Sequence, residues 1–578
     1  MPKVSNQSVA ELLREIGEHL AMQNVPFKPR AYEKAAEAVG ALEGSVVDLY
    51  AGGGLKALKE IPGVGTSIAE TMEEFITTGR VKYYEGLKKK TPVDLVGLSR
   101  VEGLGPKSIQ KLYQTLGVSD LASLEKAAKA GKISKLEGFG AKSEGKILKG
   151  IGFAKKSGER FLLGSIMPQV REIEARLAKG PGVQKVTVAG SVRRQKETIG
   201  DVDILVVSKM PKTIMDYFVG MPEVVSVIAH GETKSSVKVR PGVNVDLRVV
   251  PAESYGAALN YFTGSKDHNV ALRKLAVAKG WKLNEYGLFD VKGGREKMIA
   301  GKTEEEVYRA FGMDYIEPEL RENTGELEAA RAYGLPKLIG YGDLLGDLQV
   351  QTDWTDGADS IETMAKAAIA RGLRYIAITD HTKRLAMTHG LDEKRILKQM
   401  AEIDRLNKKF AGKIKILKGS ECDIFKDGTL DLSDAILAKL DVVGVSVHSY
   451  FDLPRAAQTE RVKRAITNSH ADILFHPSGR IINRRPPIEL DMDEIIACAK
   501  RTHTILEIDA LPERLDLKDE YIRKCVEAGV KMAIDSDAHA TTHFSLLEYG
   551  IAQARRGWAT KNDIINAWPV EKMKKSLK

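Results

Sequence analysis

Residues 188–207 read VAGSVRRQKETIGDVDILVV, and this stretch decides the fold of the first half of the chain. A short apolar run ends at Gly190, a helical turn with two arginines follows, and a second apolar run begins with Asp201. Asp201 and Asp203 stand at positions i and i+2, so on a strand both carboxylates project from one face, about 7 Å apart. The spacing predicts a pair of carboxylates that hold divalent metal ions between them.

Two further features of this region favour phosphoryl transfer. Asp246 lies in the alternating run VNVDLRVV and is expected to complete the site from a neighbouring strand. Three carboxylates with two metal ions stabilise the attacking and leaving oxygens of such a reaction. Gly190 and Ser191 end a strand and open a helix with Arg194, an arrangement suited to a nucleotide triphosphate. A solvated acidic strand end is the alternative, but it does not explain why the two motifs occur together.

The composition indicates a multidomain protein. A chain of 578 residues, 43% of them hydrophobic, is too long for a single core. Lys and Arg outnumber Asp and Glu by 88 to 78, and the net charge of +10 suits a polyanionic partner if it is clustered. The three cysteines are far apart and the sequence has no apolar run of about 18 residues, so we expect a reduced, cytoplasmic protein without membrane contact.

An internal repeat marks the N-terminal helical region. Its copies are IPGVGTSIAETM (61–72), VEGLGPKSIQKL (101–112) and LEGFGAKSEGKI (136–147). Each copy has a Gly-x-Gly turn before a helix start, where backbone N–H groups can bind a phosphate without reading a base. Helix packing is the alternative, but three copies favour DNA-backbone binding. The residues expected to contact DNA are Gly63, Gly65, Gly103, Gly105 and Lys107.

The first half resembles the X-family DNA polymerases once the run Tyr261-Phe262-Thr263-Gly264-Ser265 is added to the motifs above. By this resemblance Asp201, Asp203 and Asp246 are catalytic ligands of Mg²⁺ or Mn²⁺. The resemblance also implies a set of residues that bind the incoming dNTP, with Tyr261 and Phe262 excluding a ribose 2′-hydroxyl. This set comprises Gly190, Ser191, Arg194, Tyr261, Phe262, Gly264, Asn269 and Arg273, with Arg160 as a further phosphate ligand.

One departure from the family concerns the helix after the first hairpin. Members with deoxyribose-phosphate lyase activity use a lysine amine on this helix to form a Schiff base. Here Ser67 and Thr71 occupy the matching positions, and a hydroxyl cannot form an imine. Lys28 and Tyr32 still resemble the family's 5′-phosphate pocket. We therefore expect gap binding with weak or absent lyase activity.

The second half alternates strands with helices, which predicts a β/α barrel, and it resembles the PHP domain. The resemblance implies a trinuclear site for Zn²⁺ or Mn²⁺ with ligands from nine positions, of which Gln349 and Gln351 depart from the usual histidines. An amide is a far weaker ligand than an imidazole. By the same resemblance, His448, His476 and His539 would bind one metal ion, and Asp356, His381 and Glu421 would bind another. The seven retained candidates are Asp356, His381, Glu421, His448, His476, Asp537 and His539.

These expectations give a multidomain α and α/β fold with helix-hairpin-helix, palm, thumb and PHP barrel parts. The expected function is template-directed filling of short gaps in DNA repair by a monomer that uses gapped or primed DNA and dNTPs. The barrel is either a weakened 3′–5′ exonuclease or a module that positions DNA. A barrel phosphoesterase as the main activity and a non-catalytic DNA-end scaffold are the alternatives. The expected parts are 1–90 (8-kDa-like domain with the first hairpin), 91–155 (fingers), 156–255 (palm), 256–315 (thumb), 316–338 (linker) and 339–578 (PHP).

Overall fold

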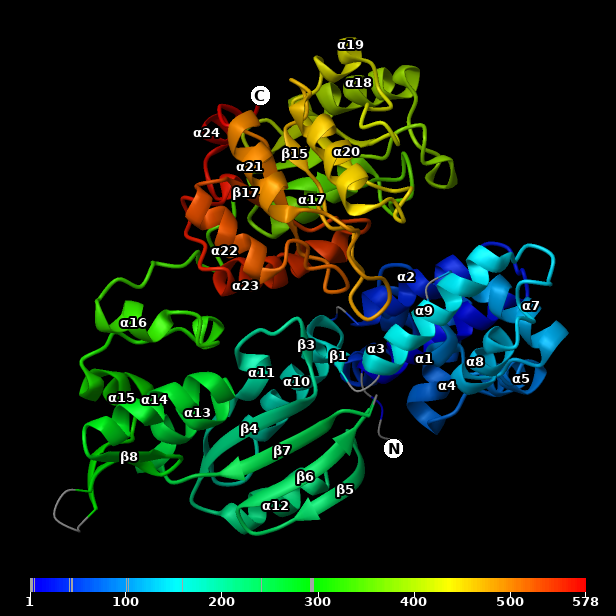
Figure 1. Cartoon of the computed structure of the whole chain (residues 1–578). Coiled ribbons are helices and arrows are strands. Elements are labelled where there is room, and N and C mark those ends of the chain that lie inside the picture. Colours follow the sequence, from blue (N-terminus) through cyan, green and yellow to red (C-terminus); the bar gives the residue numbers. More distant parts are fainter. Residues whose placement is uncertain are drawn as a thin grey trace. The chain divides into compact units, whose positions relative to one another are not determined.

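The computed structural model describes residues 4, 6–40, 42, 45–99, 101, 103–157, 160–240, 242–291 and 296–578 (Figure 1). The chain divides into two compact units. The first comprises Met1–Val192, Thr198–Tyr255 and Ile482–Arg485, and the second comprises Arg193–Glu197, Gly256–Ile481 and Pro486–Lys578. Each unit is described by itself below.

The N-terminal part of the first unit is helical, as its glycine-broken pattern predicts. Its helices are α1 (Asn6–Met22), α2 (Lys28–Gly40), α3 (Val46–Lys59), α4 (Thr66–Thr78), α5 (Lys82–Lys90), α6 (Leu95–Ser99), α7 (Pro106–Leu116), α8 (Leu121–Lys129) and α9 (Ala141–Ser157). Helices α1 to α5 enclose one apolar core, and α6 to α9 enclose a second.

All three predicted hairpins have the same backbone form. The first glycine of each has a positive φ, +80° at Gly63 and +84° at Gly103 and Gly138, a region that only glycine adopts at little cost. The second glycine, Gly65 or Gly105, is the N-cap of helix α4 or α7. The repeat therefore presents a helix N-terminus directly behind each turn.

A five-stranded sheet follows in the first unit, in the order β2-β4-β7-β6-β5. Its strands are β2 (Val183–Val188), β4 (Asp201–Ser208), β5 (Val224–His230), β6 (Lys234–Val239) and β7 (Asn244–Val249). Strands β4 and β7 are parallel and all other neighbours are antiparallel. Helix α10 (Leu163–Ala178) packs on β2, and α12 (Pro211–Val219) packs on β5, β6 and β7. The short strands β1 (Phe161–Leu162) and β3 (Thr198–Ile199) form a separate antiparallel pair.

The second unit begins with helices and a small antiparallel sheet. Its elements are α13 (Tyr255–Thr263), α14 (Lys266–Ala278), β8 (Trp281–Asn284), β9 (Gly287–Asp290), β10 (Lys297–Ala300) and α15 (Glu304–Phe311). The segment 316–338 forms a 3-10 turn and α16 (Glu326–Arg331), and it is not a loose connection despite its polar composition. Glu319 and Arg321 are buried in it because each finds an oppositely charged partner, and the buried Glu326 is hydrogen-bonded to His268.

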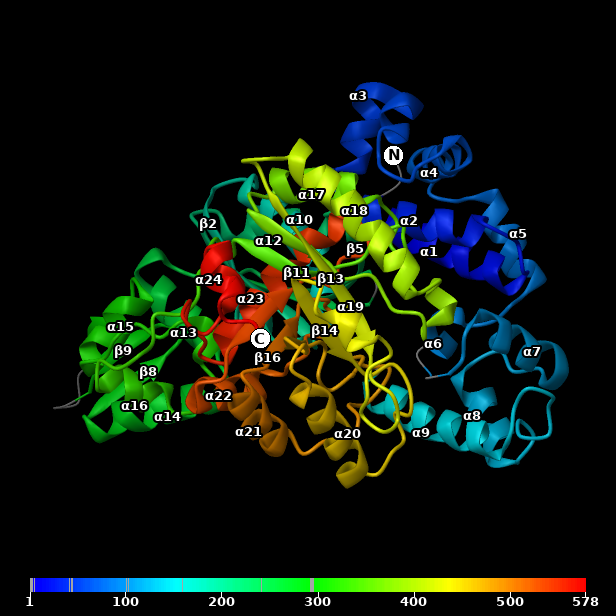
Figure 2. The same cartoon turned by 90° about the horizontal axis from the view of Figure 1, so that it is seen from above.

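The rest of the second unit is a parallel barrel whose strands are enclosed by helices (Figure 2). The strands β11 (Gly346–Val350), β12 (Tyr375–Ile378), β13 (Lys415–Asp423), β14 (Val442–Ser446), β15 (Ile473–Leu474), β16 (Ile505–Asp509) and β17 (Met532–Asp535) pair in chain order. A parallel bridge between Val350 and Ala538 joins the last strand to the first. The helices are α17 (Ile361–Ala370), α18 (Glu393–Lys409), α19 (Asp434–Leu437), α20 (Arg455–Thr467), α21 (Met492–Thr502), α22 (Asp519–Ala528), α23 (Leu547–Arg556) and α24 (Val570–Lys574).

One face of the barrel strands changes character along its length. On β16, Ile505 belongs to a buried apolar cluster, whereas Glu507 and Asp509 follow on the same face. On β17, Ala533 belongs to that cluster and Asp535 follows it. The apolar layer therefore lies at the amino ends of the strands, and the acidic and histidine side chains gather at the carboxyl ends.

Candidate active sites

The first candidate site is formed by the carboxylates of the five-stranded sheet. Asp203 on β4 is the register partner of Asp246 on β7, and Asp201 shares the face of Asp203. Burial and then the neighbouring carboxylates Asp201 and Asp246 raise the pKa of Asp203 to about 6. Lys234 Nζ lies 3.1 Å from Asp246 Oδ2. Among the described residues, the three carboxylates are not a group whose ligand atoms all lie within 4.8 Å of one another.

Gly190 is required beside these carboxylates. Its φ is +63°, and a Cβ atom at this position would lie 2.5 Å from Asp203 Oδ2. Ala189 N donates to the carbonyl of Asp203 at 2.7 Å, which ties the turn to β4. Arg160, a predicted phosphate ligand, donates from Nε to Thr198 Oγ1 (3.0 Å) and from Nη2 to the Thr198 carbonyl (2.6 Å).

The predicted dNTP-binding residues of the second unit surround one turn. The rings of Tyr261 and Phe262 meet edge to face at 5.1 Å. Asn269 Nδ2 donates to the Tyr261 carbonyl at 2.7 Å, and Arg273 Nε donates to the Asn269 carbonyl at 3.3 Å. Gly264, in the turn between α13 and α14, has a φ of +71°.

Arg193 and Arg194 both bind residues of the second unit. Arg194 Nε lies 3.0 Å from Glu322 Oε1, and its guanidinium also donates to the Thr263 carbonyl. Arg193 Nη1 donates to Thr263 Oγ1 at 2.6 Å, and Arg193 Nη2 lies 2.6 Å from Glu304 Oε2. Glu322 and Glu304 are partners that the motif did not indicate.

The residues predicted to bind a 5′-phosphate of DNA lie in the N-terminal helices. Lys28 begins α2, and Tyr32 is buried with its hydroxyl 3.4 Å from Thr71 Oγ1. Thr71 in turn donates to the Ser67 carbonyl at 2.9 Å. Of the two positions matched to the lysines of lyase-active relatives, Thr71 therefore carries a buried, hydrogen-bonded hydroxyl group and Ser67 carries an exposed one. Lys107 is exposed in the first turn of α7.

The second candidate site lies at the carboxyl ends of the barrel strands. One group of ligand atoms is Asp356, His381 and His539, and a second is His381, Glu421 and His448, each with all atoms within 4.8 Å. His476 Nε2 joins the second group, 2.9 Å from Glu421 Oε1. The expected grouping of His539 with His448 and His476 on one metal ion stays a prediction, and the structure places His539 beside Asp356 and His381. His539 follows β17, which bridges to β11, so it adjoins Asp356 after β11.

Glu421 is the centre of this site. Burial opposes its charge, but His381 and His448 hold the pKa of Glu421 well below its usual value. Burial likewise disfavours the His448 cation, but Glu421 and Asp423 outweigh it and raise the pKa of His448 to about 9. Buried oxygens of Asp356 and Asp537 have no hydrogen-bond partner among the described residues, as expected of cation ligands.

The two glutamines occupy the remaining ligand positions differently. Gln351 Nε2 donates to Glu421 Oε2 at 2.8 Å. The orientation of the Gln349 amide that satisfies its neighbours places its nitrogen against the Glu507 carboxylate. Each amide therefore directs a hydrogen-bond donor at a buried acidic side chain. The residues present fit two cation positions and do not fit the third.

Several residues of this site were missed by the sequence analysis. Asp423 Oδ1 lies 3.3 Å from His448 Nδ1, and Arg384 Nε lies 2.6 Å from Asp423 Oδ2. Arg514 Nε lies 3.4 Å from Asp509 Oδ2 and 3.9 Å from Asp537 Oδ2. The signal for Asp423 and Asp509 was their position two residues after another acid on the same strand face. No local signal indicated Arg514, which lies in a turn.

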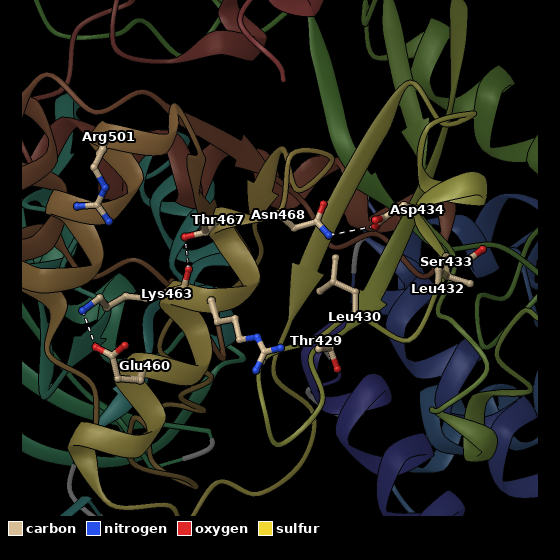
Figure 3. A pocket seen from close by; sticks show the side chains of 12 residues that line it. Thr429, Leu430, Leu432, Ser433, Asp434, Glu460, Lys463, Thr467, Asn468 and Arg501 are labelled. Atoms are coloured by element: carbon tan, nitrogen blue, oxygen red, sulfur yellow. Dashed lines mark hydrogen bonds and ion pairs between the residues drawn. The ribbon is translucent and has the colours of Figure 1, made fainter.

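A surface cavity of about 850 Å³ lies apart from these ligands (Figure 3). It is lined by the loop 428–434, by α20 and by Arg501 of α21. Lys463 points at Glu460 within it, so its charge is already paired. None of the seven barrel ligand candidates lines this cavity.

Comparisons with known proteins match parts of both halves of the chain. Family models match residues 258–322 (DNA polymerase beta thumb), 4–81 (helix-hairpin-helix domain), 96–152 (SAM-like helix-hairpin-helix tandem) and 347–510 (PHP domain). DNA polymerase/3′-5′ exonuclease PolX of Bacillus subtilis is 38% identical over 99% of both chains. The chain belongs to the X family of DNA polymerases.

Two more distant relatives match parts of this X-family polymerase. DNA polymerase lambda of Rattus norvegicus is 26% identical over 55% of this chain and 56% of its own. A probable phosphatase of Thermoanaerobacter is 29% identical over 38% of this chain and 88% of its own. The protein is thus a template-directed DNA polymerase with a PHP domain, and the relatives imply divalent metal ions, DNA and dNTPs. The described helices include none with the length and apolar character needed to span a bilayer.

Proposed function

We propose that this X-family polymerase fills short gaps during DNA repair, with Asp201, Asp203 and Asp246 as its metal ligands. The register pairing of Asp203 with Asp246 is the observation that supports this assignment most directly. Bound metal ions, Mg²⁺ or Mn²⁺ here and Zn²⁺ or Mn²⁺ in the barrel, would supply Lewis-acid and water-activating chemistry. We also propose that the protein is cytoplasmic and acts as a monomer.

The residues of the chain then have distinct tasks in nucleotide addition. Ser191 and Arg194 bind the triphosphate, and Glu322 holds Arg194 in place until the nucleotide competes for it. Tyr261 and Phe262 form a wall against a ribose 2′-hydroxyl, and the bond from Asn269 to the Tyr261 carbonyl fixes that wall. The glycine hairpins, Lys28, Tyr32 and Lys107 bind the DNA backbone, with lyase activity weak or absent.

We propose in addition that the barrel is a weakened 3′–5′ exonuclease. In favour of retained activity, Asp423 orients His448 toward Glu421, the pairing expected of a metal-ligating histidine. In favour of weakening, Gln349 and Gln351 direct donors at Glu507 and Glu421. A barrel that only positions DNA is the second candidate, and it rests on the same two amides.

A single primer assay separates these possibilities. A 5′-labelled primer on a one-nucleotide gapped duplex is incubated with Mn²⁺, with and without dNTPs. We expect Asp203→Asn to abolish extension while DNA binding persists, and Asp216→Asn, an acid of α12 bonded to His230, to extend normally. Extension by Asp203→Asn at the wild-type rate contradicts the assignment.

The same assay tests the barrel. Without dNTPs we expect the wild-type chain to shorten the primer and His448→Ala to leave it intact. Primers that are extended but never shortened favour the DNA-positioning role.

A further inference from the structure

An exposed aromatic side chain stands two residues after His448. Tyr450 is 43% exposed, and its φ of +55° lies in the left-handed region, which is unfavourable for a non-glycine residue. Side chains of α20 hold this backbone. Gln458 Nε2 donates to the Tyr450 carbonyl at 3.3 Å, and Arg461 Nη1 donates to the Ser449 carbonyl at 2.8 Å. The conformation therefore presents the Tyr450 ring at the surface despite its conformational cost.

Cationic side chains surround this ring. The Arg384 guanidinium lies 5.4 Å from the centre of the Tyr450 ring and 4.7 Å from that of Phe425. Lys426 Nζ and the Arg461 guanidinium lie 5.8 and 5.7 Å from the Tyr450 ring. We call Arg384, Phe425, Lys426 and Tyr450 the aromatic platform. An exposed ring with adjacent Arg and Lys is the combination that binds unpaired nucleotides, with the base on the ring and the phosphate near the cations.

The aromatic platform is connected to the barrel site by direct contacts. Arg384 Nε lies 2.6 Å from Asp423 Oδ2, and Asp423 Oδ1 lies 3.3 Å from His448 Nδ1. Arg384 Nη2 also donates to Ser449 Oγ at 3.1 Å. The Tyr450 ring is thus linked to the Glu421 and His448 cluster through Arg384 and Asp423.

We propose that the aromatic platform binds the unpaired 3′-terminal nucleotide of a DNA strand by stacking its base on Tyr450. This inference rests on the proposed 3′–5′ exonuclease and specifies its substrate. A base-paired terminus must first unstack, whereas a mispaired terminus is already free. The barrel therefore selects mispaired primer ends over paired ones.

Photo-crosslinking of the full chain tests the contact without catalysis. A primer with 5-iodouracil as its mispaired 3′ nucleotide is irradiated with the protein in EDTA, and the crosslinked peptide is identified by mass spectrometry. We expect the crosslink on residues 440–455, which include Tyr450. Crosslinks confined to other segments overturn the proposal.

Trimming kinetics in Mn²⁺ give an independent readout. We expect Tyr450→Ala to raise KM for a mispaired end about tenfold with kcat little changed, because one base–aromatic stack is lost. Tyr450→Phe keeps the ring and should behave like the wild type. Tyr333→Ala is the matched control, since Tyr333 is 69% exposed and has a φ of +53°. An unchanged KM in Tyr450→Ala overturns the proposal.

The two experiments separate this inference from the exonuclease itself. A crosslink at Tyr450 in a chain that never shortens primers supports the aromatic platform and contradicts the exonuclease. Primer trimming without that crosslink, and without an effect of Tyr450→Ala, supports the exonuclease and contradicts the aromatic platform.

Discussion

Gln349 and Gln351 stand where the resemblance to the PHP domain implies imidazoles, and the barrel fold is kept. Glu421 accepts a hydrogen bond from the Gln351 amide, and the Gln349 amide nitrogen lies against Glu507. Amide groups satisfy a buried carboxylate, although they supply no positive charge. The result is a barrel suited to two cations.

Restoring the imidazoles should reverse this change. We expect Gln349→His combined with Gln351→His to bind one additional divalent ion per chain and to trim primers about tenfold faster. Metal content after equilibration and gel filtration measures the first effect, and the primer assay measures the second. Adding His448→Ala should abolish the gain in trimming, and an unchanged metal content would show that the glutamines are not the cause.

A second residue-scale prediction concerns Glu304, which is 4% exposed and pairs with Arg321 (2.5 Å) and Arg193 (2.6 Å). Burial opposes its charge, but the two arginines lower the pKa of Glu304 to about 2. A depressed carboxyl pKa stabilises the folded chain above the unfolded value of 4.5, and this contribution is lost as the pH falls from there through 2. Glu304→Gln leaves Arg321 buried without a counter-charge and should cost about 3–5 kcal/mol at pH 7.

Thermal unfolding at pH 7 and pH 3 checks this. The difference between wild type and Glu304→Gln should shrink at pH 3. Glu305→Gln, in the same first turn of α15 but not in this pair, is the control. An equal loss in both variants would point to the helix rather than to the ion pairs.

At the scale of elements, the glycine hairpins were predictable because each turn has its own local signal. The positive φ at Gly63, Gly103 and Gly138 is where the Gly-x-Gly repeat indicated it. The barrel strands were predictable for the same reason. Contacts between residues far apart in the sequence were not predictable. Examples are Glu322 beside Arg194 and Arg514 beside Asp537. Their positions follow from the register and closure of the sheet, which no short stretch encodes.

The hairpin helices allow a quantitative DNA-binding test. Lys107 lies in the first turn of α7, two residues after the N-cap Gly105. If its ammonium group neutralises one phosphate, Lys107→Ala should reduce the slope of log K against log salt by about one. Lys126→Ala, in the last turn of α8, should leave the slope unchanged. Fluorescence anisotropy across a salt series measures both, and equal slopes would exclude Lys107 from the interface.

At the scale of the molecule, the second unit has a core that extends beyond the barrel. Trp558, after the barrel helix α23, is buried among Val307, Phe311 and Leu327. Arg555 Nε lies 2.7 Å from Glu319 Oε1, and both side chains are buried. The thumb region and the barrel should therefore unfold together.

Hydrogen exchange tests this cooperativity. Trp558→Ala removes a large buried side chain and should cost about 3–5 kcal/mol. We expect faster exchange in α15 and in α23 together. Trp568→Ala, in the inner apolar cluster of the barrel, should affect barrel amides first. Faster exchange confined to α23 in Trp558→Ala would mean that the two parts open independently.

The seam of the barrel has a consequence for synthesis on the ribosome. Gln351 N donates to the Ala538 carbonyl at 2.8 Å, and Ala538 N donates to the Gln349 carbonyl at 3.2 Å, so the seam joins the first strand of the domain to the end of the last. Translation at about 5–20 residues per second separates their emergence by tens of seconds. During that time β11 has one open edge, a template for wrong pairing. The nascent barrel should therefore depend on chaperones until its last strand arrives.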